Sequence, residues 1–262
     1  MEEKKVPVIV IDAGHGGSDS GAVHGKRKEK DDVLKLALAV GKTLEEDYIA
    51  YIKYTRTTDI YEKPSKKTKD AEGFGGSLLV SIHRNYGITK TSTGYETLVY
   101  SNVDVKKVIA EEVNKGMAEL GYKNRGTKIR TDLTILKVKG MPAVLFEVGF
   151  ISNKADNKIF DNKFDEIVGV IVNAIAKGME LKKKPIEAEK KFENGNFNKN
   201  VRTTTSLNVR SGRGTDYKIL GTLPKDTVVK ALYILTKDGA PWASIDYGKS
   251  VGYICLDYVV KE

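Results

Sequence analysis

The most constraining feature of this chain is a short apolar run that ends in a glycine-rich loop. Residues Val6–Ile11 are all apolar, and the segment Asp12–Gly17, which contains three glycines, follows at once. An uninterrupted apolar run is typical of a strand that is buried on both faces of a sheet. Because glycines disfavour regular structure, the sequence predicts a tight loop at the carboxyl end of a central strand.

Strand-like and helix-like patterns alternate over the first 180 residues. Short apolar runs predict strands at Ile49–Thr55, Leu78–Ile82, Glu96–Tyr100 and Ala143–Val148, and apolar residues at helical spacing predict helices over Asp32–Tyr48, Val105–Leu120 and Phe164–Met179. Such alternation is typical of the α/β class. We therefore expect a mixed, mainly parallel sheet flanked by helices.

The composition changes after Met179. The segment 181–200 contains Lys182–Pro185 followed by mixed charges, with little that is able to form a core, so it is predicted to be a linker. Short apolar runs separated by turn residues then continue to Glu262. They predict a small all-β barrel over residues 201–262.

The bulk composition excludes few functions. The chain is 40% hydrophobic and 30% charged, which is ordinary for a globular protein, and its net charge of +9 suits an anionic polymer such as nucleic acid, an acidic membrane surface, teichoic acid or peptidoglycan. No apolar stretch reaches the ~18 residues of a membrane span, and no nucleic-acid-binding motif accompanies the charge. The single cysteine, Cys255, lies in an apolar run and is expected to be packed rather than reactive.

Two of the three histidines follow predicted strands. His15 lies in the glycine-rich loop, and His83 comes directly after Ile82. The carboxyl ends of strands in an α/β sheet form sites, so these imidazoles converge if their strands are neighbours. Glu29 precedes the first predicted helix on the same side, and two histidines with one carboxylate are able to hold a catalytic zinc ion. The spacing alone leaves open the alternative of ordinary polar surface residues.

One carboxylate interrupts a strongly apolar run. Glu147 lies within Pro142–Phe150, where burial of a charge is costly unless the group is paired or has a chemical role. A raised pKa would suit a general base beside a metal ion. The alternative is a carboxylate that is satisfied by a helix end or a lysine.

Four ordered segments resemble the amidase-3 family of N-acetylmuramoyl-L-alanine amidases, which is typified by bacterial autolysins and phage endolysins. The segments are Ile9–Gly17 with Asp19 and Gly21-Ala22, then Glu29–Asp31, Ser81–Asn85 and Pro142–Asn153. The resemblance covers roughly residues 6–180 and implies a zinc ion held by His15, Glu29 and His83, with Glu147 as the catalytic residue. His24 matches no ligand position, and Asp12 and Asp19 are expected to fix the loop or the ligands.

The chain departs from the family pattern at two places that bear on specificity. Arg84 stands where the family more often has a small residue, and Asp70–Gly76 lacks the usual arginine and asparagine. Arg125 and Arg130 are open to two interpretations, as contacts for peptide carboxylates or as surface charges.

The carboxyl-terminal region resembles a bacterial SH3 domain. The resemblance rests on Ser206–Gly212, Leu220–Leu223, Trp242, and Gly252–Ile254 with Tyr258. Such domains commonly bind peptidoglycan. Trp242 is expected either on a binding face or in the barrel core, and Arg210 in a structural turn.

The sequence thus predicts hydrolysis of the amide bond between N-acetylmuramic acid and L-alanine in peptidoglycan, which lyses bacterial cell walls. Residues 1–180 would form the zinc amidase domain, 181–200 the linker and 201–262 the SH3-like wall-binding domain. The alternatives are a non-catalytic peptidoglycan-binding protein on an amidase scaffold, and a zinc peptidase or deacetylase acting on the wall. The partner is peptidoglycan, with neither nucleic acid nor membrane, and the oligomeric state stays open. The lack of a recognisable signal peptide favours a phage endolysin, made in the cytoplasm and acting at the wall, over an exported autolysin.

Overall fold

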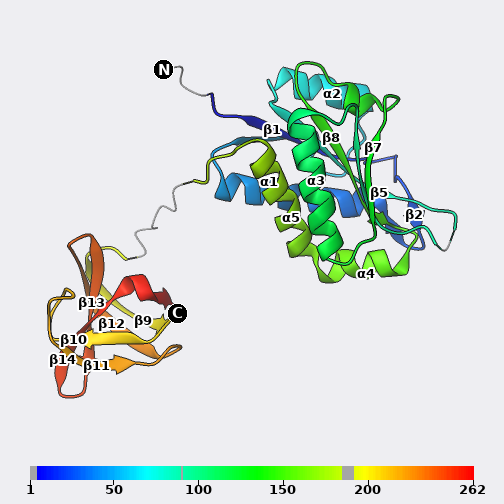
Figure 1. Cartoon of the computed structure of the whole chain (residues 1–262). Coiled ribbons are helices and arrows are strands. Elements are labelled where there is room, and N and C mark those ends of the chain that lie inside the picture. The colour runs from blue at the N-terminus through cyan, green and yellow to red at the C-terminus, as the bar shows by residue number, and fades with distance from the viewer. Residues whose placement is uncertain (1–4, 90, 185–191) are drawn as a thin grey trace. The chain divides into compact units, whose positions relative to one another are not determined.

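The chain divides into two compact units, Met1–Lys184 and Pro185–Glu262 (Figure 1). The computed structural model describes residues 5–89, 91–184 and 192–262. The predicted fold class is confirmed: a mixed, mostly parallel sheet with helices is followed by an antiparallel β unit. The predicted linker 181–200 stays a prediction, because residues 185–191 lie outside the described part of the chain.

The first unit is built on a six-stranded sheet with the strand order β4-β1-β5-β8-β6-β7. Its strands are β1 (Val8–Ala13), β4 (Tyr51–Tyr54), β5 (Leu78–Asn85), β6 (Tyr95–Val99), β7 (Asn124–Ile129) and β8 (Ala143–Phe150). Strands β4, β1, β5 and β8 run parallel, and β6 pairs antiparallel with β8 and parallel with β7. A short hairpin of β2 (Val23–His24) and β3 (Arg27–Lys28) lies outside this sheet.

Helices cover both faces of the sheet (Figure 1). The larger core packs α1 (Glu29–Asp47), α3 (Asp104–Glu119) and α5 (Phe164–Gly178) against one face. The smaller core packs α2 (Pro64–Gly73) and the 3-10 helix η1 (Thr134–Lys137) against the other. A short helix, α4 (Lys154–Asn162), follows β8. Because side chains alternate along a strand, Ile9 and Ile11 enter the larger core and Val10 the smaller.

The same alternation selects the face on which polar side chains emerge. Leu79 of β5 and Leu145 of β8 pack in the smaller core. His83 and Glu147 follow them at even spacing and are paired in register across β5 and β8. Both therefore project toward the α2 and η1 side at the carboxyl ends of the parallel strands.

Three elements carry no clear signal in the sequence. Helix α2 buries only Lys67 and Ala71, so it lacks an apolar stripe. Strand β7 is a polar edge strand, and α4 is a short helix with two buried residues. Helix α1 begins at Glu29, three residues before the predicted start. Its first turn is acidic, which stabilises the amino-terminal end of a helix but adds no apolar residue to the helical pattern.

The second unit is a seven-stranded antiparallel sheet with the order β11-β10-β14-β13-β12-β9-β15. Its elements are β9 (Gly195–Thr203), β10 (Leu207–Arg210), β11 (Ile219–Leu223), β12 (Val228–Lys237), β13 (Ala240–Tyr247), β14 (Ser250–Cys255), η2 (Leu256–Tyr258) and β15 (Val259–Lys261). Strand β9 begins before residue 201, where the sequence places the start of this domain. The first residues of β9, from Gly195 to Asn200, are mostly polar, so only their pairing with β12 identifies them as part of a strand. Cys255 is buried, as expected.

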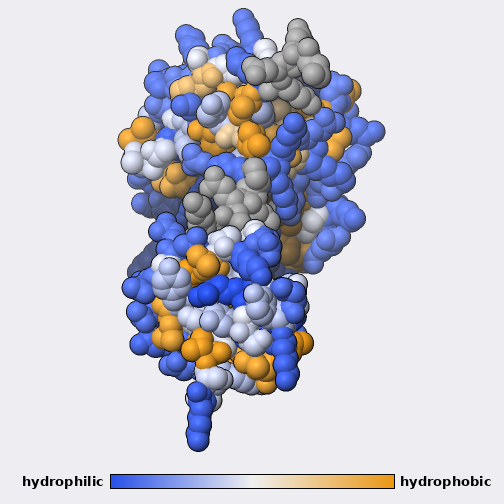
Figure 2. All heavy atoms as spheres, turned by 90° about the vertical axis from the view of Figure 1, so that its left-hand side faces the viewer, coloured by the Kyte–Doolittle hydropathy of each residue, from blue (hydrophilic) through white to orange (hydrophobic). Residues whose placement is uncertain are grey.

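Surface hydropathy is mixed on the face drawn in Figure 2, where hydrophobic groups are small and hydrophilic side chains separate them. Among the described residues, no helix has both the length and the apolar character needed to span a bilayer.

Candidate metal centre and active site

The glycine-rich loop after β1 brings His15 beside His83. Gly14 donates its backbone N–H to the Ile82 carbonyl at 3.0 Å, which fastens the loop to β5. A Cβ on Gly14 would lie 2.3 Å from the His83 ring, so only glycine leaves room for that imidazole. His15 itself has a φ of 56°, a conformation that costs energy in a non-glycine residue and that occurs often at functional sites.

Three side chains converge at this point from separate elements. The Nε2 atom of His15 lies 3.2 Å from one Glu29 oxygen, and Nδ1 of His83 lies 3.0 Å from the other. The imidazole rings are 4.9 Å apart in an edge-to-face arrangement. The ligand atoms of all three residues lie within 4.8 Å of one another. The structure thus brings together the three residues that the sequence predicts as metal ligands.

Glu29 is held rigidly although it is almost fully buried. Its carboxylate accepts backbone N–H groups from Ala22 at 2.9 Å and from Arg84 at 2.9 Å. Burial alone would raise the pKa of Glu29, but its contacts with His15 and His83 outweigh burial and hold it far below its ordinary value. Glu29 is therefore ionised at neutral pH, which is the form that binds a cation.

Asp19 sets the orientation of His15. Its carboxylate lies 2.8 Å from His15 Nδ1, which leaves Nε2 directed at Glu29. Burial opposes the charged imidazole, but the carboxylates of Glu29 and Asp19 outweigh burial and raise the pKa of His15 to about 9. A carboxylate behind an imidazole is the usual support of a metal-binding histidine. The expectation that Asp19 is a supporting residue agrees with this geometry.

A buried ion pair fixes the end of β1, where the glycine-rich loop begins. Asp12 accepts hydrogen bonds from Thr55 and Ser81, each at 2.6 Å, and lies 2.9 Å from Lys67 Nζ. Lys67 also donates to the Ala13 carbonyl at 2.7 Å. Burial disfavours the charge on Asp12, but Lys67 outweighs it and lowers the Asp12 pKa.

Sequence reasoning missed Lys67 and a second buried cation, Arg56. Arg56 donates to the carbonyls of Ala13, Gly14 and Lys30 and so clamps the loop to the start of α1. A lone basic residue in a polar segment gives no signal of burial. Only the tertiary structure reveals what each of them contacts.

Glu147 lies on the wall of a cavity of about 410 Å³ that also exposes His15 and His83. Its Oε2 atom is buried without a hydrogen-bond partner within the described part of the chain. Burial raises the pKa of Glu147 to about 7, with the neighbouring Glu29 and Glu96 adding to the effect and His83 opposing it. A carboxyl group with a near-neutral pKa is able to accept and return a proton at physiological pH.

Other residues singled out in the sequence lie outside the metal cluster. His24 is exposed in β2. Arg84 is buried and donates to Asp32, to Asn157 and to the Val148 carbonyl, so this departure from the family pattern is a structural contact between elements. Arg130 lines the cavity with Glu147, whereas Arg125 instead donates to Glu96 at 2.8 Å.

The structure thus shows an α/β protein with a cluster of two histidines and a glutamate that could hold a metal ion. Residues 9–180 match the protein family described as N-acetylmuramoyl-L-alanine amidase, and residues 205–260 match the bacterial SH3 domain. The chain belongs to the N-acetylmuramoyl-L-alanine amidase family. The prediction of an amidase acting on peptidoglycan, with a bacterial SH3 domain at its carboxyl end, is confirmed by these matches.

Individual relatives share both sequence and structure with this chain. The endolysin of Bacillus phage SPP1 is 34% identical over 186 residues, which span 68% of each protein. The sporulation-specific N-acetylmuramoyl-L-alanine amidase of Bacillus subtilis strain 168 is 29% identical over 217 residues, covering 81% of this chain and 84% of that protein. The catalytic domain of CwlV, an amidase from Bacillus (Paenibacillus) polymyxa var. colistinus, superimposes with a TM-score of 0.62 at 32% identity, covering 68% of this chain and all of that domain.

Proposed function

We propose that this chain is a zinc-dependent amidase in which His15, Glu29 and His83 hold the metal ion and Glu147 is the catalytic acid and base. One observation carries the proposal: the two imidazoles that converge on the Glu29 carboxylate line one cavity with Glu147, whose Oε2 atom has no hydrogen-bond partner among the described residues. Two histidines and one carboxylate are a common zinc-binding set in hydrolases, with a fourth position left for water. The donor atoms therefore fit zinc in number and in type.

Each residue of the chain has a defined part in the proposed reaction. Zinc, when bound, supplies Lewis acidity, which makes a water molecule more acidic and stabilises negative charge on a carbonyl oxygen. Glu147 accepts the proton of the attacking water as it adds to the lactyl carbonyl of N-acetylmuramic acid. Glu147 then returns that proton to the amine of L-alanine, and the amide C–N bond breaks.

The surrounding residues hold this arrangement in place. Asp19 keeps His15 Nε2 directed at the metal position, and two backbone N–H groups fix the Glu29 carboxylate. The pair formed by Asp12 and Lys67 anchors the end of β1, from which the loop departs. Ligand side chains that are fixed before the metal binds lose little freedom on binding, which favours both affinity and geometry.

We further propose that the second unit binds the wall polymer. The match of residues 205–260 to the bacterial SH3 domain supports this role, as does a cavity of about 390 Å³ in that unit. The cavity offers polar groups from Asn208, Arg210 and Asp257 beside the ring of Trp242. Tethering an enzyme to an insoluble polymer raises the local concentration of cleavable bonds.

Mass spectrometry of purified peptidoglycan digested by the full chain tests the proposal. The digestion is repeated after chelation, after zinc is restored, and with Glu147→Gln. We expect stem peptides with a free amino-terminal L-alanine, lost on chelation, regained with zinc and absent with the variant. Products cut within the peptide or the glycan would contradict the bond assignment, and activity that survives complete metal removal would contradict the role of zinc. Wall binding without any products would favour a non-catalytic scaffold.

A further inference from the structure

The active-site cavity extends beyond the candidate ligands toward α2. Three buried side-chain atoms in the described part of the chain lack a hydrogen-bond partner, and two of them belong to residues that line this cavity. One is Glu147 Oε2, which the proposed reaction uses. The other is Glu62 Oε2, from the residue pair that precedes α2, and the reaction gives it no part.

Glu62 is held in place by only one of its oxygens. Its Oε1 atom accepts a hydrogen bond from Lys66 Nζ at 2.8 Å, and Lys66 also binds Asp70 at 2.6 Å. The Glu62 side chain is 13% exposed, whereas that of Lys66 is 56% exposed. A desolvated carboxylate oxygen with no donor is costly, so a donor supplied by a ligand would relieve that cost.

The charges around the cavity indicate which donor fits. Its two fixed cations are already paired, Lys67 with Asp12 at 2.9 Å and Arg130 with Asp132 at 2.6 Å. Glu62 is paired with Lys66 through Oε1 at 2.8 Å, so Oε2 is the acceptor that none of these cations uses. A positively charged donor gains most from such a site, because a hydrogen bond between ions is stronger than a neutral one.

The apolar part of the lining indicates what the cation is attached to. Four aliphatic side chains share the cavity with Glu62, namely Leu98, Leu133, Ile135 and Leu145. These side chains suit a chain of methylene groups better than a hydrated sugar ring. An amine carried on an aliphatic stem is the group that the amino acid with two amines in a wall stem peptide presents.

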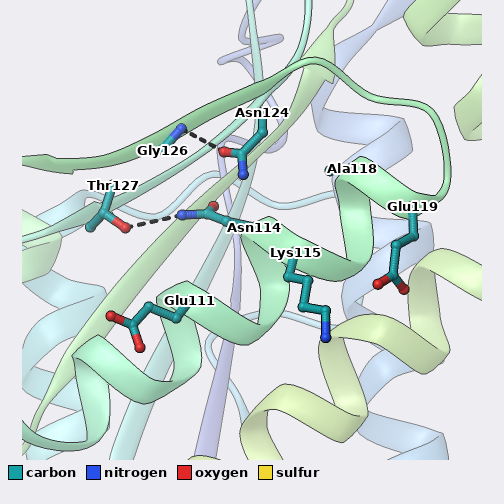
Figure 3. Close-up of a pocket in the computed structure, with 8 residues that line it drawn as sticks. All are labelled: Glu111, Asn114, Lys115, Ala118, Glu119, Asn124, Gly126 and Thr127. Carbon is teal, nitrogen blue, oxygen red and sulfur yellow. Dashed lines mark hydrogen bonds between the residues drawn. The ribbon is translucent and has the colours of Figure 1, made fainter.

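A groove between α3 and β7 provides a contrast (Figure 3). It is larger, at about 610 Å³, but the two asparagines that line it are hydrogen-bonded within the protein. Asn114 bonds to Thr97 and Thr127, and Asn124 accepts the N–H of Gly126. No orphaned group there calls for a ligand among the described residues.

We propose that Glu62 is a specificity residue that binds the protonated side-chain amine of the diamino acid in the stem peptide. The inference rests on the proposed amidase function and deepens it. Because cross-linking of the wall acylates that amine and removes its charge, the enzyme prefers stem peptides that are not cross-linked. An amine on a deacetylated sugar has the same charge but lacks the aliphatic stem.

Two soluble substrates test the proposal with the full-length zinc-loaded enzyme. They are N-acetylmuramoyl-L-alanyl-D-isoglutaminyl-L-lysine and the same compound acetylated on the lysine side chain. We expect the native enzyme to favour the free amine by about tenfold in kcat/KM, the size of one charged hydrogen bond. Glu62→Gln removes this preference through a higher KM, with kcat little changed. The matched control is Asp70→Asn, which takes a carboxylate from the same lysine outside this cavity and keeps the preference.

A binding measurement separates this inference from the proposed function. Calorimetry with the tripeptide L-alanyl-D-isoglutaminyl-L-lysine and its acetylated form requires no hydrolysis. Weaker binding of the acetylated tripeptide to the native chain, with the difference lost in Glu62→Gln, supports the subsite even if neither substrate is cleaved. Equal discrimination by the native chain and Glu62→Gln would overturn it, as would tighter binding of a deacetylated muramyl sugar than of the tripeptide.

Discussion

The cavities of the two units differ in how the polar groups that line them are satisfied. In the first unit, Glu62 and Glu147 line the cavity of the candidate active site, and each has one buried carboxylate oxygen without a hydrogen-bond partner among the described residues. In the second unit, Arg210 and Trp242 line the cavity of about 390 Å³. Arg210 donates to the carbonyls of Thr215 and Tyr217, and Trp242 is packed with only 4% of its surface exposed. Among the described residues of that unit, one buried atom, Arg213 Nε, also lacks a hydrogen-bond partner, and its guanidinium lies 4.7 Å from the centre of the Tyr253 ring.

This difference follows from the work that each unit is proposed to do. Chemistry needs groups that are desolvated and held ready for a proton, a metal ion or a substrate, and such groups cost stability until they are occupied. The second unit, Pro185–Glu262, is small, so its core is small and it has little stability to spare. Loss of a polar group should therefore affect reaction rates in the first unit and retention on the wall in the second.

The largest effect is expected from Glu147→Gln. Glutamine keeps the shape of the side chain but is unable to accept the proton, so kcat should fall by about 10²–10⁴-fold, the usual contribution of a general base. Measured zinc content and thermal midpoint serve as controls, because Glu147 is not a proposed ligand. A variant that keeps native kcat would remove Glu147 from the mechanism.

The next effect concerns metal affinity and pH. In the metal-free protein the pKa of His15 is raised to about 9, so below that pH the imidazole carries a proton that zinc must displace. Apparent affinity should therefore fall as pH falls, by about tenfold per pH unit and about a hundredfold between pH 9 and pH 7. Competition with a chromophoric chelator at several pH values measures this slope.

The control for this measurement is the exposed histidine of β2. His24→Ala should keep the native slope, because His24 lies outside the cluster. His15→Ala should weaken zinc binding and flatten the slope. Native-like affinity and slope in His15→Ala would show that another residue binds the metal.

The sequence predicts the first unit well wherever side chains alternate or recur with a clear period. The buried strands β1, β5 and β8 and the helices α1, α3 and α5 all appear near their predicted positions. Helix α2 does not, because the residues that it buries are Lys67 and Ala71, and a buried lysine looks the same in sequence as an exposed one.

In the candidate site too, some residues are predictable from the sequence and others are not. The positions of His15 and His83 after strands, and of Glu147 inside an apolar run, follow from the sequence together with the family resemblance. The roles of Arg56 and Lys67 do not, since they bind backbone carbonyls and a carboxylate far away along the chain. The proposed role of Glu62 is not predictable from the sequence either, because only the structure shows that one of its oxygens has no donor.

A smaller effect is expected from Gly14→Ala. The added methyl group would lie 2.3 Å from the His83 ring, so either the loop or the imidazole must shift. Displacement of one ligand should lower zinc affinity on the order of tenfold, as loss of a supporting contact does. Gly169→Ala in α5 is the matched control, since a Cβ there meets nothing within 4 Å. Equal zinc affinities in the two variants would show that the tight loop is not required for the cluster.

The smallest effect on the chemistry itself is expected when the second unit is removed. The fragment Met1–Lys184 contains the whole first unit with its core and its cluster, so its kcat/KM on a soluble muramyl peptide should stay within about twofold of the full chain. On intact walls the same fragment should be slower, because it loses the tether that raises the local substrate concentration. Co-sedimentation with purified walls and turnover of the soluble substrate measure the two properties separately. If the fragment lost activity on both substrates equally, the separation between a reactive first unit and a retaining second unit would be wrong.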